Sequence, residues 1–193
     1  MGGGDKALLQ VGAYTILART LAVLIPFPVA LSANGDPARF ASYGVPVLAD
    51  AAPSQSGPLA GILSAMRWAA RQGHAQVLTV PGDCPFLPAD LVPRMHAAGP
   101  GIVMAGSGGR THNATALWPT HLYDDLAAAL EAGQRRVEGY ASRHGVRTVE
   151  WPTTPFDPFL NVNTPEDLAA ARALTPPCAT APAAARPRTH PPG

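Results

Sequence analysis

The residue best placed to do chemistry is Asp83, which follows a short apolar run, Val77–Val80. Pro81-Gly82 ends that run, as expected where a buried strand gives way to a turn. A carboxylate at the end of a central strand points into the ligand crevice of an α/β sheet, where it can hold Mg²⁺ together with substrate phosphates. We therefore expect Asp83 to be the metal ligand, although an Asp that caps the next turn would fit the same pattern.

Two glycine-containing stretches could bind phosphate groups. Residues 2–6 (GGGDK) let backbone N–H groups approach an anion and add a lysine charge. Residues 57–59 open a predicted helix, whose first N–H groups and positive dipole end attract anions. A flexible terminus and an ordinary helix start are the simpler interpretations. The candidate nucleotide-binding residues here are Gly2, Gly3, Lys6, Gly57, Pro58 and Leu59.

Amide and carboxylate side chains follow other predicted strands. Asn34 and Asp50 each close a short strand, where they could bond a base, a ribose or a phosphate. Asn34 also begins an Asn-Gly pair, which is common in plain turns. Asn161 and Asn163 lie on the same side of an extended segment ahead of the last helix, where they could bond a polar substrate.

Other reactive side chains carry weaker signals. Arg135 and Arg136 could clamp a phosphate, although such a pair is more often a solvated helix start. A loop histidine such as His112 is usually not catalytic. Cys84 has no His or Asn arrangement that argues for a nucleophile, and with Cys178 it makes neither a disulfide framework nor a zinc site.

Helical and strand-like patterns alternate along the chain, which predicts an α/β fold. A mostly parallel sheet covered by helices on both faces follows from this alternation. Thr164 and Pro165, followed by two acids, mark the clearest helix start. The predicted helices span 14–24, 58–72, 89–98, 122–132, 136–144 and 165–174. The predicted strands span 28–33, 45–49, 77–80, 102–105, 115–118 and 146–151.

Composition limits the class of protein. With 193 residues and 47% apolar residues, the chain suits one domain, expected over 1–174, with a disordered Pro- and Ala-rich tail over 175–193. A formal net charge of +1 argues against nucleic-acid binding. Neither a membrane span nor a signal peptide is indicated. Two cysteines suit a reducing cytoplasm.

Several fragments occur in the order typical of one family, and together they run from residue 1 to about residue 174. On these fragments the chain resembles the molybdenum cofactor guanylyltransferases of the MobA type. GDCPFLP and NVNTPEDL are the most distinctive. The matching fragments are MGGGDKALL (1–9), SAN (32–34), VLAD (47–50), GPLAG (57–61), VPGDCPFLP (80–88), GQRRV (133–137) and NVNTPEDL (161–168).

The resemblance implies a three-layer Rossmann-like nucleotidyltransferase fold, Mg²⁺ as cofactor, and GTP and Mo-molybdopterin as substrates. GMP would pass from GTP to the terminal phosphate of Mo-molybdopterin, with release of pyrophosphate. Lys6 would contact the triphosphate, and Asp83 would bind both nucleotide and Mg²⁺. Molybdenum insertion proteins and chaperones of recipient molybdoenzymes are the implied partners. We assign acceptor binding to Asn161, Asn163, Arg135 and Arg136, and further nucleotide contacts to Asn34 and Asp50.

The chain departs from the family pattern at its start. The opening strand, the first glycine pair of the loop and an arginine are absent, so we expect an N-terminally truncated form of the fold. His112-Asn113 stands where His-Pro is expected. We favour a start codon placed too far downstream, because the site residues after Met1 survive. The alternatives are a related transferase that uses CTP or another phosphorylated acceptor, and a truncated, non-catalytic nucleotide-binding protein.

Overall fold

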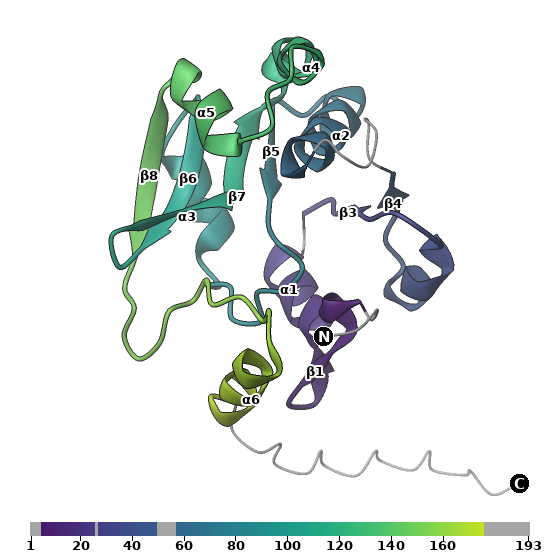
Figure 1. Cartoon of the computed structure of the whole chain (residues 1–193), viewed down its shortest axis with the longest axis vertical. Coiled ribbons are helices and arrows are strands. Elements are labelled where there is room, and N and C mark those ends of the chain that lie inside the picture. The colour runs from purple at the N-terminus through teal and green to yellow at the C-terminus, as the bar shows by residue number, and fades with distance from the viewer. Residues whose placement is uncertain (1–4, 26, 50–56, 176–193) are drawn as a thin grey trace, which may run out of the picture.

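The centre of the molecule is a four-stranded sheet in the order β5-β7-β6-β8 (Figure 1). The computed structural model describes residues 5–25, 27–49 and 57–175. β7 runs antiparallel to both neighbours, while β6 and β8 are parallel, so β5, β6 and β8 all point the same way. The sheet is therefore mixed, not mostly parallel as expected: two of its three strand pairs are antiparallel, because β7 is inserted between β5 and β6. The strands are β5 (Gln76–Thr79), β6 (Ile102–Ser107), β7 (Arg110–Pro119) and β8 (Val146–Trp151).

Helices cover both faces of this sheet, which gives the predicted three layers (Figure 1). Side chains of a strand alternate between faces. Along β6, Ile102 and Met104 therefore join one core, while Val103 and Ala105 join the other. The first core packs against α2 (Pro58–Arg71), α4 (Tyr123–Glu131) and α5 (Val137–Ala141), and the second against α3 (Leu91–Ala97).

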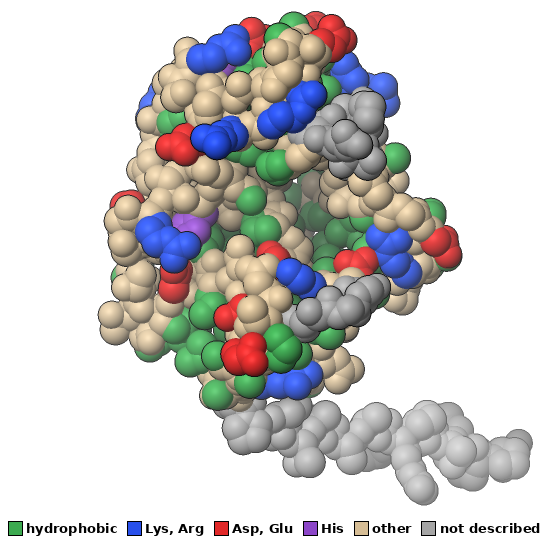
Figure 2. Space-filling model, in the orientation of Figure 1, with side chains coloured by type: hydrophobic (Ala, Val, Ile, Leu, Met, Phe, Trp, Pro, Cys, Tyr) green, Lys and Arg blue, Asp and Glu red, His purple; other side chains and the backbone are tan. Residues whose placement is uncertain are grey.

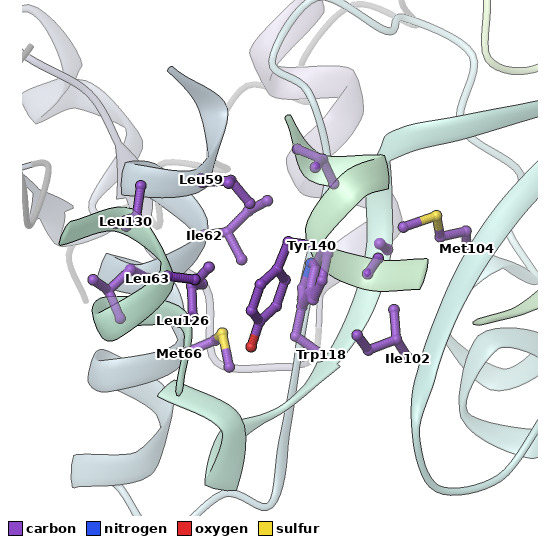
Figure 3. Packing of buried hydrophobic residues seen from close by; sticks show 14 residues of the cluster. Leu59, Ile62, Leu63, Met66, Ile102, Met104, Trp118, Leu126, Leu130 and Tyr140 are labelled. Atoms are coloured by element: carbon purple, nitrogen blue, oxygen red, sulfur yellow. The ribbon is translucent and has the colours of Figure 1, made fainter. Parts of the chain in front are cut away.

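Trp118 lies at the middle of the first core and is fully buried (Figure 3). In Figure 3 its ring lies beside Tyr140 from α5, and Met66 from α2 lies on the other side of Tyr140, in the same cluster. The indole N–H is satisfied by the Thr79 hydroxyl at 3.0 Å, so the burial leaves no unpaired polar group on the ring. Truncating such a side chain costs about 3–5 kcal/mol of stability, so this core holds β5 and β7 in place.

The residues before β5 form shorter elements. β1 (Gln10–Val11) and β2 (Tyr14–Thr15) make a small hairpin, and α1 (Ile16–Leu24) follows it directly. Thr15 caps α1 by accepting a hydrogen bond from the Ala18 N–H. The predicted helix over 14–24 is therefore confirmed, but it begins two residues later. The 3-10 turns are Lys6–Leu8, Pro37–Tyr43, Thr120–Leu122 and Ser142–His144.

β3 (Leu31–Ser32) and β4 (Val47–Leu48) form a separate parallel pair. Within the described residues no backbone ladder joins this pair to the main sheet, although α2 contacts both β3 and β5. The space-filling view is hollowed between β5 and β3 (Figure 2). β5, expected as a central strand, is an edge strand of the four-stranded sheet. The opening strand of the family pattern, which would pair beside it, is not among the described strands.

The last helix, α6 (Pro165–Ala173), begins with a full capping box: Thr164 accepts from the Asp167 N–H, and Asp167 accepts from the Thr164 N–H. This confirms the predicted start.

The tail expected from sequence begins at Thr175, whose hydroxyl donates a hydrogen bond to the Ala171 carbonyl. The remaining tail, 176–193, lies outside the described residues. In the described part of the chain no helix is both long and apolar enough to cross a membrane.

Candidate active site at the carboxyl ends of the strands

Asp83 lies in the turn after β5, at the carboxyl end of the strand. Its backbone carbonyl accepts a hydrogen bond from the Val162 N–H at 2.9 Å, which ties the turn to the segment ahead of α6. Burial raises the pKa of the Asp83 carboxyl above its usual range, against a hydrogen bond from its own backbone N–H and the nearby Lys6 charge. A partly desolvated carboxylate beside a cation suits a position where metal and phosphate charges meet.

Lys6 reaches the same place from the other end of the chain. Its ammonium donates to Asn163 Oδ1 at 2.9 Å, and its charge acts on Asp83. The structure therefore brings together three residues selected from sequence that are separated by up to 157 positions. A lysine, a carboxylate and an amide at one sheet edge can bind the phosphates of two substrates.

Asn161 also joins this cluster, through Cys84. The Cys84 thiol donates to Asn161 Oδ1 across 2.8 Å, and Cys84 is 1% exposed. Asn161 itself is exposed. Asn161 and Asn163, expected on the same side of an extended segment, thus each accept one side-chain hydrogen bond, from Cys84 and from Lys6, and their role in acceptor binding stays a prediction.

Asn34 follows β3 and is exposed. Its backbone carbonyl accepts from Arg39, and the same guanidinium donates to the Asp5 carboxylate at 2.7 Å and to the Asp36 carbonyl at 2.7 Å. Arg39 therefore fixes the Asn34 turn to the residue that precedes Lys6. Sequence reasoning missed Arg39, because no local pattern joins it to an acid 34 positions away.

Gly57 is the N-cap of α2, with φ of 66°, a conformation that favours glycine. Pro58 occupies the first helical turn and lacks an N–H, so Leu59 supplies the first amide N–H of the helix. The Arg135 carbonyl lies 3.6 Å from where a Cβ on Gly57 would be. The predicted helix start is thus present, with the Arg135 carbonyl beside it, and its binding of phosphate stays a prediction.

Arg135 and Arg136 lie at the start of α5 rather than beside the asparagine pair. The Arg135 guanidinium donates to the Leu130 and Gln134 carbonyls, and both arginines are exposed. In the described part of the chain no hydrogen bond links either arginine to Asn161 or Asn163. Their assignment to the acceptor stays a prediction, as do Gly2, Gly3 and Asp50, which lie outside the described residues.

The donor set fits a hard divalent cation such as Mg²⁺. Asp83 offers one carboxylate, and Mg²⁺ in phosphoryl-transfer sites is held by one or two carboxylates plus substrate phosphates and water. The described residues contain no group of three or more His, Cys, Asp or Glu that could form an all-protein cage. Asp83 would hold the cation, and the substrates would complete its coordination.

A second polar group, built from Ser107, His112 and Asp157, lies behind the asparagine segment. The Ser107 hydroxyl donates to Asp157 Oδ1 at 2.8 Å and lies 2.7 Å from His112 Nε2. Burial lowers the pKa of His112 below its usual range, against the opposing effect of Asp157. These are the residue types of a hydrolase triad, but the serine stands in the middle and is buried, so it is no nucleophile.

An α/β domain with a carboxylate, a lysine and paired amides at the carboxyl ends of its strands is built as a nucleotide-binding transferase. The chain belongs to the family of MobA-like NTP transferase domains, whose model matches residues 1–148. Among curated relatives, the molybdenum cofactor guanylyltransferase of Rhodopseudomonas palustris (strain BisB5) is 48% identical over 183 residues, which cover 90% of this chain and 87% of that protein.

Solved structures share the fold. Molybdopterin-guanine dinucleotide biosynthesis protein A from Archaeoglobus fulgidus superposes with a TM-score of 0.68 at 20% identity, covering 89% of this chain and 90% of that one. A Mycobacterium tuberculosis H37Rv protein in complex with manganese gives 0.65 at 18% identity, covering 89% and 93%. The Rossmann-like nucleotidyltransferase fold expected from the sequence is confirmed by these likenesses.

Proposed function

We propose that this chain transfers GMP from GTP to the terminal phosphate of Mo-molybdopterin. An acceptor phosphate oxygen attacks the α-phosphorus of GTP, a new P–O bond forms, and the bond to the β-phosphate oxygen breaks. Pyrophosphate leaves, and the guanine dinucleotide form of the cofactor results. The name of the Rhodopseudomonas palustris relative, at 48% identity over nearly the whole chain, supports this choice of substrates.

The observation that carries the proposal is the meeting of Asp83, Lys6 and Asn163. Lys6 neutralises triphosphate charge and holds the nucleotide in register with the acceptor. Asp83 would hold Mg²⁺, which supplies charge neutralisation on the transferred phosphoryl group. Asn163 joins the lysine to the acceptor segment, so the two substrate sites share one hydrogen bond. Little covalent chemistry is asked of the protein, and positioning supplies most of the rate.

The N-terminus of α2 and the Asn34 turn would hold the nucleotide from the other side. Free N–H groups at a helix start stabilise phosphate, and Gly57 lets the chain enter the helix without a side chain in the way. The buried free thiol of Cys84 suits the reducing cytoplasm that we propose as its location. Insertion proteins or molybdoenzyme chaperones would then receive the product.

The test is direct incubation with molybdopterin, Mg²⁺ and GTP, CTP or ATP in turn. Pyrophosphate release and the mass of the dinucleotide product are measured. We expect a guanine dinucleotide with GTP and little product with CTP. A cytosine product would replace the proposed donor, and tight GTP binding without pyrophosphate release would indicate a non-catalytic nucleotide-binding protein. Omitting Mg²⁺ and adding Mn²⁺ tests the metal separately.

A further inference from the structure

Both candidate acceptor amides have their carbonyl oxygens occupied from inside the protein. Asn161 Oδ1 accepts from the Cys84 thiol, and Asn163 Oδ1 accepts from the Lys6 ammonium. An amide side chain carries one carbonyl and one NH₂ group. With each carbonyl turned towards a donor inside the protein, the NH₂ group on the same carbon, which only donates, is turned the other way and is left for a ligand.

Cys84 is a fixed donor in this arrangement. The sulfur lies against two oxygens that only accept hydrogen bonds, Asn161 Oδ1 at 2.8 Å and the Phe159 carbonyl at 3.8 Å. A thiolate would have no proton to offer these oxygens, so the contact requires the protonated thiol as donor. The Asn161 amide is thus held with its oxygen towards the sulfur.

The backbone beneath the amides is held by a second set of contacts. Asp157 Oδ1 accepts from the Ser107 hydroxyl and from the Phe159 N–H at 3.0 Å. Because the single Ser107 proton goes to Asp157, His112 donates its Nε2 proton to Ser107. The His112 ring also stacks on Phe159, with 4.6 Å between centroids. Ser107 is 1% exposed, so this anchor lies within the core.

We propose that Cys84 and Ser107 are positioning residues that, together with the bond from Lys6 to Asn163, preset the NH₂ groups of Asn161 and Asn163 as a donor surface for the acceptor's phosphate monoester. The inference rests on the proposed function for the identity of that acceptor. A phosphate dianion offers only acceptor oxygens, so two outward NH₂ groups beside an ammonium match it, whereas outward carbonyls would repel it. Presetting the amides removes the cost of ordering them at each turnover.

The kinetic test compares Cys84→Ala with Cys84→Ser. Cys84→Ala loses the donor and lets the Asn161 amide rotate, so we expect KM for molybdopterin to rise about 10-fold while KM for GTP stays unchanged. Cys84→Ser keeps a hydroxyl donor at a distance suited to O–H···O contact, and it should return KM to near the starting value. Ser107→Ala should raise the same KM by about 3- to 10-fold.

Thr120→Val is the matched control, because it deletes a buried side-chain donor, to the His74 carbonyl, on the far side of the core. It should leave both KM values unchanged. Equal acceptor KM in Cys84→Ala and the unaltered protein would overturn the proposal. A serine variant as impaired as the alanine variant would also overturn it, because cavity formation would then explain the effect.

A second readout does not depend on turnover. In ¹⁵N-labelled protein the Asn161 side-chain NH₂ signals should shift on titration with inorganic phosphate, and the shift should be lost in Cys84→Ala and kept in Cys84→Ser. If the unaltered protein forms no dinucleotide but these shifts hold, the proposed function fails and the phosphate-recognising surface stands. If the protein turns over but the Asn161 signals do not respond, the positioning role fails alone.

Discussion

The two sides of the candidate site are built differently. From β5 onward, the strands are four to ten residues long and two cores pack against them. Before β5, the strands are two residues each, and β3 and β4 are only partly buried. Asp83 and the asparagine pair belong to the first side, while Lys6 and Asn34 belong to the second.

The contacts that hold each side differ in the same way. Buried donors such as Cys84 and Ser107 fix the acceptor side, whereas the nucleotide side depends on Arg39 and an ion pair with Asp5 whose side chains are each 31% exposed. Buried hydrogen bonds restrict motion more than exposed ion pairs, which contribute little by themselves. We infer that the acceptor side is preformed and that the nucleotide completes the order of its own side.

Asp83→Asn should give the largest effect, because it removes the carboxylate that we propose as the cation ligand. We expect kcat to fall about 100- to 1,000-fold, as when a transition-state charge partner is removed. Pyrophosphate release at saturating GTP and molybdopterin measures it. Near-normal turnover would contradict the metal role of this residue.

Asp83→Asn should leave the fold intact. Without metal, the free energy of unfolding of this variant should exceed that of the unaltered protein near neutral pH. Burial raises the folded-state pKa of the carboxyl, so its ionised form opposes folding. That cost is present above the folded pKa, shrinks as pH falls towards the unfolded pKa, and is absent below it. Thermal unfolding of the two proteins across this range should converge at low pH. A variant that is less stable at pH 7 would show that the carboxylate has a structural partner.

Lys6→Ala should give the next largest effect, because it changes the nucleotide side of the site. We expect GTP affinity to fall about 10- to 100-fold, since a hydrogen bond to a charged group is lost at the phosphates. Isothermal titration with GTP in the absence of acceptor measures it directly. Unchanged GTP affinity would remove Lys6 from the triphosphate site.

The bond between Lys6 and Asn163 joins the two sides, so a double-mutant cycle should reveal their coupling. Asn163→Ala alone should weaken GTP binding about 3- to 10-fold, because it frees the lysine that meets the triphosphate. In the Lys6→Ala background the same change should have almost no further effect on GTP. Additive effects would show that the two residues act independently and that the sides are not linked here.

Arg39→Met should give the smallest effect, confined to the nucleotide side. We expect KM for GTP to rise about 2- to 5-fold with no change in acceptor KM, since a partly exposed pair is lost. Adding salt to the unaltered protein should mimic part of this loss, because salt screens exposed charges. An equal rise in acceptor KM would argue that the two sides are one cooperative unit.

Long elements with a clear apolar period could be predicted from the sequence, and short ones could not. The helix over 58–72 matches α2 closely, because Leu59, Ile62, Leu63 and Met66 repeat at helical spacing into one core. The β1–β2 hairpin is too short for any period. The 3-10 turn at Pro37–Tyr43 did carry a local signal, since Asp36 caps it by accepting from the Ala38 N–H. β7 runs antiparallel between β5 and β6. This order depends on long-range strand pairing, which no local sequence pattern shows.

For the candidate site, the sequence singles out individual residues but does not show which residues they contact. Asp83 and Asn163 stood out because each follows a strand or precedes a helix cap. Sequence patterns test Cys84 as a nucleophile, a disulfide partner or a zinc ligand, and none of them reveals its bond to Asn161, which spans 77 positions. Ser107 gave no signal, because a serine at a strand end is common. Which side chains meet depends on where the sheet positions the turns that carry them. The packing of the whole core sets those positions.

The Lys6–Asn163 bond closes a loop of nearly the whole domain, and this has a consequence for the order of folding. Closing so long a loop costs entropy that only an already packed core can offset. During refolding, the tryptophan fluorescence, to which the buried Trp118 and Trp151 contribute, should therefore reach its final value before the protein can hold GTP. Binding competence should emerge last, when the first and final segments of the domain meet.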